Sequence, residues 1–454
     1  MTLNDENKNF YRKMILIGVP VVFQNLISLG LNLIDTLMIG MLGEKELAAV
    51  GAANQVYFIF TVSLFGLFSG AAVYTAQYWG ARDLKGVQKM LGIDYLVGFI
   101  FALSVSICAY VFAYQIIGLF TKDSEVIELG VGYIRIACIS YTFSALTYSI
   151  SYNSRAIQDL MVPTIINAVA LGINALLNYL LIFGAFGFPQ LGVKGAAVAT
   201  LTARVIEFIS MIVYIYTRKE HPFKTGFSNL FGFDMKMFKT VMKTAIPVVF
   251  TEGSWSVSVA LIFAAYGKLG TSALAVAQVS NVVSELLQSV YFGVGNATAM
   301  IIGEILGQGR KDTAFRYGKK SVNIVWVLNI VMTLFMIAIA KPVAGVYNFS
   351  GETNVLLIKT LIMMALLITP KMLGYIYIVG ILRAGGDTVF SMKLEIFCNM
   401  LVHLPLAYFA VLVLHTSLPI AMMIVEIGNI VRIAICIPRY RSKKWINVVT
   451  EEKL

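Results

Sequence analysis

Charged residues are scarce in this chain. Only 13% of its 454 residues are Asp, Glu, Lys or Arg, whereas 58% are hydrophobic. Soluble domains carry about 25% charged residues, so a soluble globular class is excluded. Apolar runs of roughly 20 residues, enough to cross a bilayer core of about 30 Å, recur along the whole sequence. The sequence therefore predicts an all-α integral membrane protein whose main surroundings are the lipid bilayer.

Residues that carry most enzyme chemistry are also few. There are four cysteines and three histidines, and neither set has metal-ligand spacing. The cysteines fall inside apolar runs and are expected to be inert core residues: Cys108, Cys138, Cys398 and Cys436. No phosphate loop or nucleophile motif is present, so we expect no enzyme and no cofactor.

The net charge of +11 does not indicate a nucleic-acid partner, because the 35 Lys and Arg are scattered over short loops.

Twelve apolar runs separated by charges, Gly or Pro predict twelve transmembrane helices. Their approximate bounds are 14–41, 52–79, 91–117, 126–150, 161–184, 194–216, 244–267, 279–303, 319–340, 355–381, 394–413 and 417–438. We expect an N-lobe at 1–216, a cytoplasmic linker at 217–243, and a C-lobe with a cytoplasmic tail at 244–454.

The basic residues predict the orientation. The N-terminus, the even-numbered loops and the C-terminal tail hold 25 Lys and Arg, the odd-numbered loops six, and the helices four. Cytoplasmic loops are the ones rich in Lys and Arg. We therefore expect a multi-pass protein of the cell (inner or plasma) membrane with both termini in the cytoplasm.

The two halves are related by an internal repeat. A shift of 227 residues places Pro20–Gly80 on Pro247–Gly307 without gaps, and 15 of the 61 positions are identical. A shift of 228 places Arg155 on Arg383 and Asp159 on Asp387. Two pseudo-symmetric six-helix bundles of the same orientation are typical of transporters that work by alternating access.

Three acidic residues lie inside predicted spans: Asp35, Glu252 and Glu285. A charge at the bilayer centre costs about 2.5 to 3.5 kcal/mol, so each of these acids is expected to have a functional or structural role. A partly dry carboxyl can exchange a proton or hold a sodium ion, which would couple an ion gradient to conformation. Alternatively, the acids pair with intramembrane bases and fix helix packing; the bases are Arg135, Arg204, Lys371 and Arg432.

Two amides could complete a cation site. Asn174 and Asn178 are four residues apart and project from one helical face. Their carbonyl oxygens beside one carboxylate would suit a hard cation such as Na⁺, and Thr200 could add a hydroxyl. An inter-helix hydrogen bond explains the two amides equally well.

Several motifs together resemble the multidrug and toxic compound extrusion (MATE) family, and more closely its NorM-like branch. They are NLIDTLMIG around Asp35, NALLNYLLIFG with Asn178, LGVKGAAVAT ending at Thr200, PVVFTEGSW with Glu252, and LRAGGDT. The resemblance implies a secondary active antiporter that exports small cationic organic compounds or drugs in exchange for Na⁺ or H⁺, and we expect a monomer. It implies ion coupling through Asp35, Asn174, Asn178, Thr200 and Glu252, with Na⁺ at Asp35, Asn174 and Asn178.

Two positions depart from the family pattern. Asn178 stands where many relatives have a second acid, and Lys371 where NorM-like members place an acid. These departures leave the C-lobe ion site open, with Glu285 and Lys371 as additional intramembrane charges. A lipid-linked oligosaccharide flippase of the same superfamily is the main alternative, since Lys371, Arg135 and Arg204 could serve an anionic cargo. A passive channel or signalling membrane protein is a second.

Overall fold

The computed structural model describes residues 3–347 and 349–448, and every regular element within them is helical. The chain forms two compact units. One is Phe23–Met242, and the other joins Met1–Val22 to Lys243–Leu454. We call them the Asp35 unit and the Glu252 unit after the acid that each contains.

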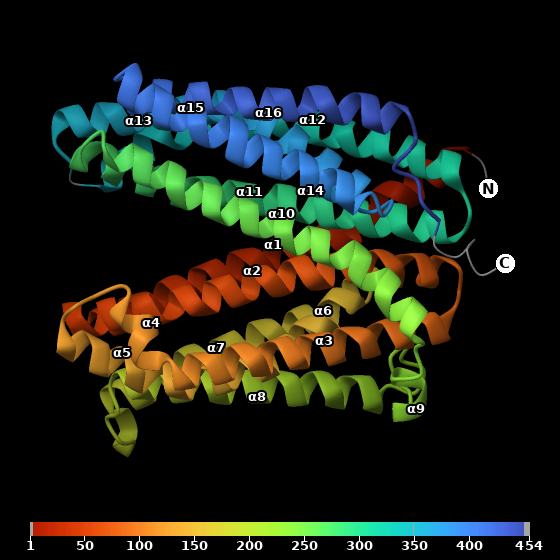
Figure 1. The fold of residues 1–454 in the computed structure, drawn as a ribbon, viewed down its shortest axis with the longest axis horizontal. Coiled ribbons are helices and arrows are strands. Elements are labelled where there is room, and N and C mark those ends of the chain that lie inside the picture. The colour runs from red at the N-terminus through yellow and green to blue at the C-terminus, as the bar shows by residue number, and fades with distance from the viewer. Residues whose placement is uncertain (1–2, 348, 449–454) are drawn as a thin grey trace. The chain divides into compact units, whose positions relative to one another are not determined.

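The Asp35 unit consists of the later part of the first helix and the helices that follow it (Figure 1). They are α1 (Leu3–Gly40), α2 (Glu44–Gly80), α3 (Leu84–Val111), α4 (Ala113–Gly118), α5 (Ser124–Ala137), α6 (Ile139–Ala156), α7 (Met161–Phe183), the 3₁₀ turn η1 (Ala185–Gly187), α8 (Val193–Thr217) and α9 (Phe227–Leu230).

The Glu252 unit contains the start of α1 and the helices of the second half of the chain. They are α10 (Met235–Gly267), which belongs to this unit from Lys243 onward, α11 (Thr271–Gly307), α12 (Lys311–Val346), α13 (Gly351–Tyr375), η2 (Ile376–Leu382), α14 (Thr388–Ile396), η3 (Phe397–His403), α15 (Leu404–Tyr408), η4 (Phe409–Val413) and α16 (Leu418–Arg441). The segments η2, η3 and η4 are π-helical, a local widening that is frequent at functional sites.

Each predicted span corresponds to a helix or a group of helices. Within the described residues, eleven helices are long and apolar enough to cross a membrane. The bent pair of Ser124–Ala137 and Ile139–Ala156, with a 45° bend, makes a twelfth if it is one span. The predicted all-α fold with twelve spans is therefore confirmed.

Within the described residues, the chain up to Val22 packs with the second half of the chain, whereas the N-lobe was expected to start at residue 1. The Lys13 ammonium lies 2.5 Å from the Glu304 carboxylate, and the Phe10 ring contacts Tyr317 at 4.7 Å between centroids. Gly18 and Gly293 also cross so closely that a Cβ on Gly293 would lie 2.7 Å from the Gly18 carbonyl oxygen. The helix therefore belongs to one unit at its start and to the other where it carries Asp35.

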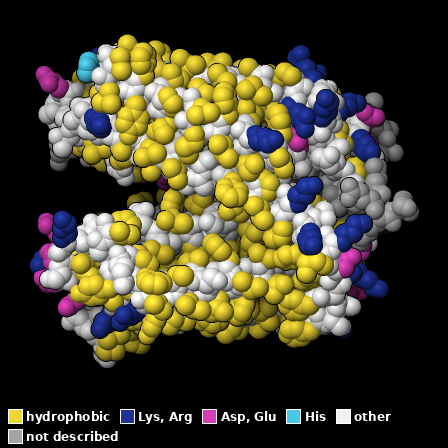
Figure 2. Space-filling view, viewed as in Figure 1, with side chains coloured by type: hydrophobic (Ala, Val, Ile, Leu, Met, Phe, Trp, Pro, Cys, Tyr) yellow, Lys and Arg dark blue, Asp and Glu magenta, His cyan; other side chains and the backbone are white. Residues whose placement is uncertain are grey.

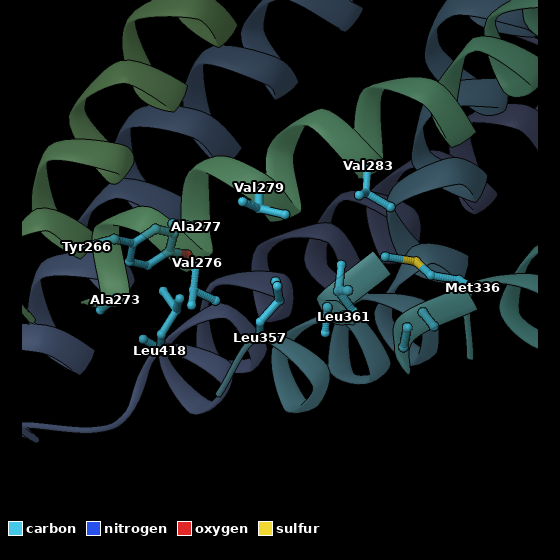
Figure 3. Packing of buried hydrophobic residues seen from close by; sticks show 14 of the residues in the cluster. Tyr266, Ala273, Val276, Ala277, Val279, Val283, Met336, Leu357, Leu361 and Leu418 are labelled. Atoms are coloured by element: carbon cyan, nitrogen blue, oxygen red, sulfur yellow. The ribbon is translucent and has the colours of Figure 1, made fainter. Parts of the chain in front are cut away.

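Hydrophobic side chains fill the interior of the Glu252 unit and also cover its outside. Tyr266, Val276, Leu357 and Leu418 meet in one buried cluster drawn from α10, α11, α13 and α16 (Figure 3). Figure 2 shows apolar side chains along the length of the helices, with most visible Lys and Arg near helix ends. An apolar outer surface is what a lipid solvent requires.

One expectation about the cysteines is wrong. Cys138, Cys398 and Cys436 are buried, but Cys108 is exposed on α3. An apolar run in a membrane helix does not have to face the protein interior, because lipid tails are as apolar as core side chains.

Candidate cation site and buried charges

The loop between α7 and α8 places a polar seam between these two helices. Gly184 ends α7 in the left-handed region with φ 69°. Gly195 near the start of α8 lies so close to α7 that a Cβ would stand 2.5 Å from the Leu181 carbonyl oxygen. The two backbones therefore approach closely at Leu181, three residues after Asn178 on α7.

Asp35 of α1 meets both predicted amides. The Asn178 Nδ2 donates to Asp35 Oδ1 at 2.8 Å. With the Asn174 amide turned so that both its ends find partners, its Nδ2 donates to Asp35 Oδ2 at 2.9 Å and its Oδ1 accepts from the Thr200 backbone N–H at 3.2 Å. The structure thus brings together all four residues predicted for this site: Asp35, Asn174, Asn178 and Thr200.

The Asp35 carboxyl is partly buried and forms no ion pair within the described residues. Both amides are at least nine-tenths buried, at 7% exposure for Asn174 and 2% for Asn178. The Asn178 Oδ1 is buried and has no hydrogen-bond partner in the described part of the chain. Oxygen atoms of Asp35, Asn178 and Thr200 are the ligand type that a hard cation prefers, so the residues present fit Na⁺ as well as a proton.

A buried ion pair lies one helical turn further along the same seam. Arg204 Nη1 and Glu207 Oε2 of α8 are 2.6 Å apart, and the Glu207 side chain is 1% exposed. Asn167 of α7 donates to Glu207 Oε1 at 2.7 Å. Arg204, proposed from sequence as a partner for an acid, therefore pairs with Glu207 and reaches Asp35 only through longer-range electrostatics.

Glu252 has a direct partner. Arg383 Nη2 donates to Glu252 Oε1 at 2.8 Å, and both side chains are largely buried, at 14% and 3% exposure for Glu252 and Arg383. In the other unit, the repeat-related Arg155 donates to Gln24 Oε1 at 2.7 Å, next to the position matched to Glu252. The first helix of each repeat is thus held by an arginine at the same place.

The Glu252 unit contains a further charged network that sequence reasoning missed. Arg432 lies 3.1 Å from Glu395 and donates to Asn399 at 3.0 Å and to Asn429 at 2.7 Å. Asn429 in turn donates to Glu426 at 2.6 Å. Glu395 and Glu426 both lie inside predicted spans, so a survey of every acid within a span would have found them, and also Glu207.

Lys371 and Glu285 form no hydrogen bond or ion pair with any side chain in the described part of the chain. Lys371 interacts electrostatically with Glu426, Arg432 and Glu285. Arg135, the remaining predicted intramembrane base, lies over the Tyr110 ring, 5.5 Å from its centroid. No predicted acid therefore pairs directly with any of the four bases proposed for it.

A two-repeat, all-helical membrane fold with polar groups inside each six-helix bundle defines a multi-pass membrane transporter. The MatE family model matches residues 20–180 and again residues 247–409, one match in each repeat. The chain belongs to the MatE family, as the motifs predicted.

Relatives cover nearly the whole chain. The uncharacterized transporter YisQ of Bacillus subtilis is 26% identical over 91% of this chain and 90% of its own length. The probable multidrug resistance protein NorM of Thermotoga maritima is 23% identical, covering 99% of this chain and 97% of its own. One of these relatives is named a transporter and the other a probable multidrug resistance protein, and neither name supports a flippase.

A solved structure confirms the fold. The crystal structure of MATE in the bent conformation superposes with a TM-score of 0.87 over 96% of both chains, at 19% identity. At that identity the likeness concerns the arrangement of helices, so the role of each polar residue has to be argued from this chain.

Proposed function

We propose that this protein is a secondary active efflux antiporter that exports small organic cations or drugs in exchange for inward-moving Na⁺ or H⁺. The observation that carries the proposal is the Asp35 carboxyl, which has amide partners but, among the residues that the structure describes, no base within hydrogen-bond distance. A permanent ion pair would fix the charge of a carboxyl, whereas amide partners leave it able to bind and release a cation. The relatives named for multidrug resistance support drugs as the exported class.

The amides act differently in the two forms of the site. When Asp35 is ionised, Asn174 and Asn178 each donate to one of its oxygens. When a cation binds, an amide has to turn its oxygen toward the ion, and this rearrangement changes how α1 meets α7. Antiport requires that binding of the ion and of the substrate be mutually unfavourable. One charge moving through 100 mV supplies about 2.3 kcal/mol for this cycle.

Glu252 is less able than Asp35 to bind and release a cation. Glu252 is paired with Arg383, and a similar contact with the neutral Gln24 is made in the other repeat. These contacts support a packing role for Glu252 and make Asp35 the principal coupling residue. We further propose that the protein works as a monomer in the cell membrane with both termini in the cytoplasm, which the bias of basic residues supports.

The experiment is ethidium efflux from energised vesicles, driven either by a sodium gradient or by a pH gradient. We expect one gradient to drive efflux by the wild-type protein and Asp35→Asn to abolish it at unchanged expression. Glu125→Gln is the matched control, because it neutralises an acid whose side chain is 64% exposed. Full gradient-driven efflux by Asp35→Asn would refute the proposal.

A further inference from the structure

A second carboxyl of the Asp35 unit is more deeply buried than Asp35 itself. Asp94 of α3 is 1% exposed and lies about 15 Å from the start of that helix by the helical rise. It is not among the acids that the sequence motifs single out. A fully buried carboxyl in a membrane helix needs a compensating group or a bound ligand.

Within the described residues, Asp94 accepts one side-chain hydrogen bond and forms no ion pair. Asn153 of α6 donates from Nδ2 to Asp94 Oδ2 at 2.7 Å. Thr75 of α2 donates to Asn153 Oδ1 at 2.6 Å, which holds the amide with its N–H₂ toward the carboxyl. The other carboxyl oxygen, Asp94 Oδ1, is buried and has no partner in the described part of the chain.

This arrangement selects a proton over a metal cation. Thr75 occupies the Asn153 carbonyl oxygen, so the amide presents only donors to the carboxyl. A metal ion would need that oxygen turned toward it, which would break the hydrogen bond from Thr75. A proton needs only the unpartnered Oδ1, and it leaves the bond from Asn153 to Oδ2 intact.

We propose that Asp94, Asn153 and Thr75 form a second, proton-binding site in the Asp35 unit, separate from the site at Asp35. The Asp94 carboxylate takes up one proton on Oδ1 and becomes a neutral carboxylic acid, and no other bond forms or breaks. The neutral acid allows α2, α3 and α6 to pack as they do here, since an ionised and unpaired carboxylate would draw water or a counterion between them. Release of the proton therefore loosens this contact.

The test is infrared spectroscopy of the purified full-length protein at neutral pH. We expect the carbonyl stretch of a protonated carboxylic acid in the wild type, its loss in Asp94→Asn, and its retention in Asp35→Asn. The proposal is overturned if the spectra of wild type and Asp94→Asn show the same carboxylic-acid band from mildly acidic to mildly alkaline pH. Because no transport is measured, this outcome is independent of whether the chain is an antiporter.

A second measurement examines the packing. The melting temperature of the wild type should fall on going from mildly acidic to mildly alkaline pH more than that of Asp94→Asn. Only in the wild type does residue 94 ionise on unfolding while it stays protonated in the folded protein, and this stabilises the unfolded chain as pH rises. Asn is nearly the size of Asp and can keep the bond with Asn153, so the variant is expected to fold. Equal pH dependence in the two proteins would contradict the proposal.

Discussion

At the scale of single residues, the membrane-buried arginines are held by acids that sequence motifs did not single out. Arg204 pairs with Glu207 and Arg432 with Glu395, at repeat-related arginines. Breaking a buried pair by removing one partner costs about 3 to 5 kcal/mol, because the other charge stays buried. The arginines therefore depend on their acids for stability.

We predict that Glu207→Gln lowers the thermal stability of the purified protein markedly, because Arg204 is then buried without its counter-charge. The double variant Arg204→Gln with Glu207→Gln should recover most of the loss, since neither charge remains. The measurement is thermal unfolding in detergent. A single variant as stable as the wild type would show that the pair does not compensate the buried charge.

Outside the membrane-spanning helices, the contacts of Asp159 make the stability of the fold depend on pH. Asp159, in the loop between α6 and α7, accepts from Tyr214 at 2.8 Å and from Arg218 at 2.9 Å, with the His221 ring beside it. Interaction with His221, followed by the bonds from Tyr214 and Arg218, lowers the pKa of Asp159 below its usual 3.8. A lowered folded-state pKa stabilises the fold above the unfolded value, and the contribution is lost as pH falls through the folded value.

We predict that Asp159→Asn destabilises the protein at neutral pH and that the difference from the wild type shrinks below about pH 4, as Asp159 becomes protonated in the unfolded and then the folded protein. Thermal unfolding across pH measures this, with the exposed Asp123→Asn as a control. A stability difference that stays constant down to strongly acidic pH would contradict the assignment of the stabilising contacts to the carboxylate.

At the scale of elements, the contact of α7 with α8 positions the Asp35 site. Gly195 is needed there because a Cβ would meet backbone atoms of Leu181, which cannot rotate away as a side chain can. Gly172 of α7 has no atom within 4 Å of a Cβ placed on it. The two glycines therefore form a matched pair for testing the contact.

We predict that Gly195→Ala forces α8 away from α7 and weakens ion-driven efflux at least tenfold, equivalent to about 1.4 kcal/mol. Gly172→Ala should leave efflux within twofold of the wild type, because a methyl group there meets nothing. Efflux from vesicles with matched protein content is the measurement. Equal efflux by the two variants would mean that the helix contact does not position the site.

The elements also show where sequence reasoning succeeded and where it failed. The hydrophobic runs predicted the helices, because a segment that crosses a lipid bilayer has to be apolar and has to satisfy its own backbone hydrogen bonds. The internal repeat predicted that the helices form two similar halves. The pattern could not show that α1 changes units after Val22, since that depends on the contacts of Lys13 and Gly18 far along the chain. The hydrophobic pattern also did not indicate Arg383 as the partner of Glu252, because Arg383 lies in the loop just beyond the predicted span 355–381.

At the scale of the whole molecule, the distribution of basic residues predicts the orientation in the membrane. We expect a cysteine placed at Lys8 in a cysteine-free background to react with an impermeant thiol reagent only after the membrane is opened. A cysteine at Lys45 should react from outside in intact cells, because it lies in an odd-numbered loop. The opposite labelling pattern would invert the topology and contradict the direction of export.

The two units divide the chemistry unequally. Among the described residues, Asp35 is hydrogen-bonded by two amides, whereas Glu252 and Glu395 of the other unit each lie within 3.1 Å of an arginine. We therefore expect ion and substrate to be linked through Asp35, with Na⁺ or H⁺ weakening substrate binding in proportion to its occupancy of that carboxyl.

The most direct measurement is the affinity of the purified protein for ethidium as Na⁺ concentration and pH are varied separately. We predict that one of the two ions lowers the affinity of the wild type and that Asp35→Asn removes this dependence while ethidium still binds. An ethidium affinity that is independent of both ions in the wild type, or that depends on them equally in Asp35→Asn, would contradict the account.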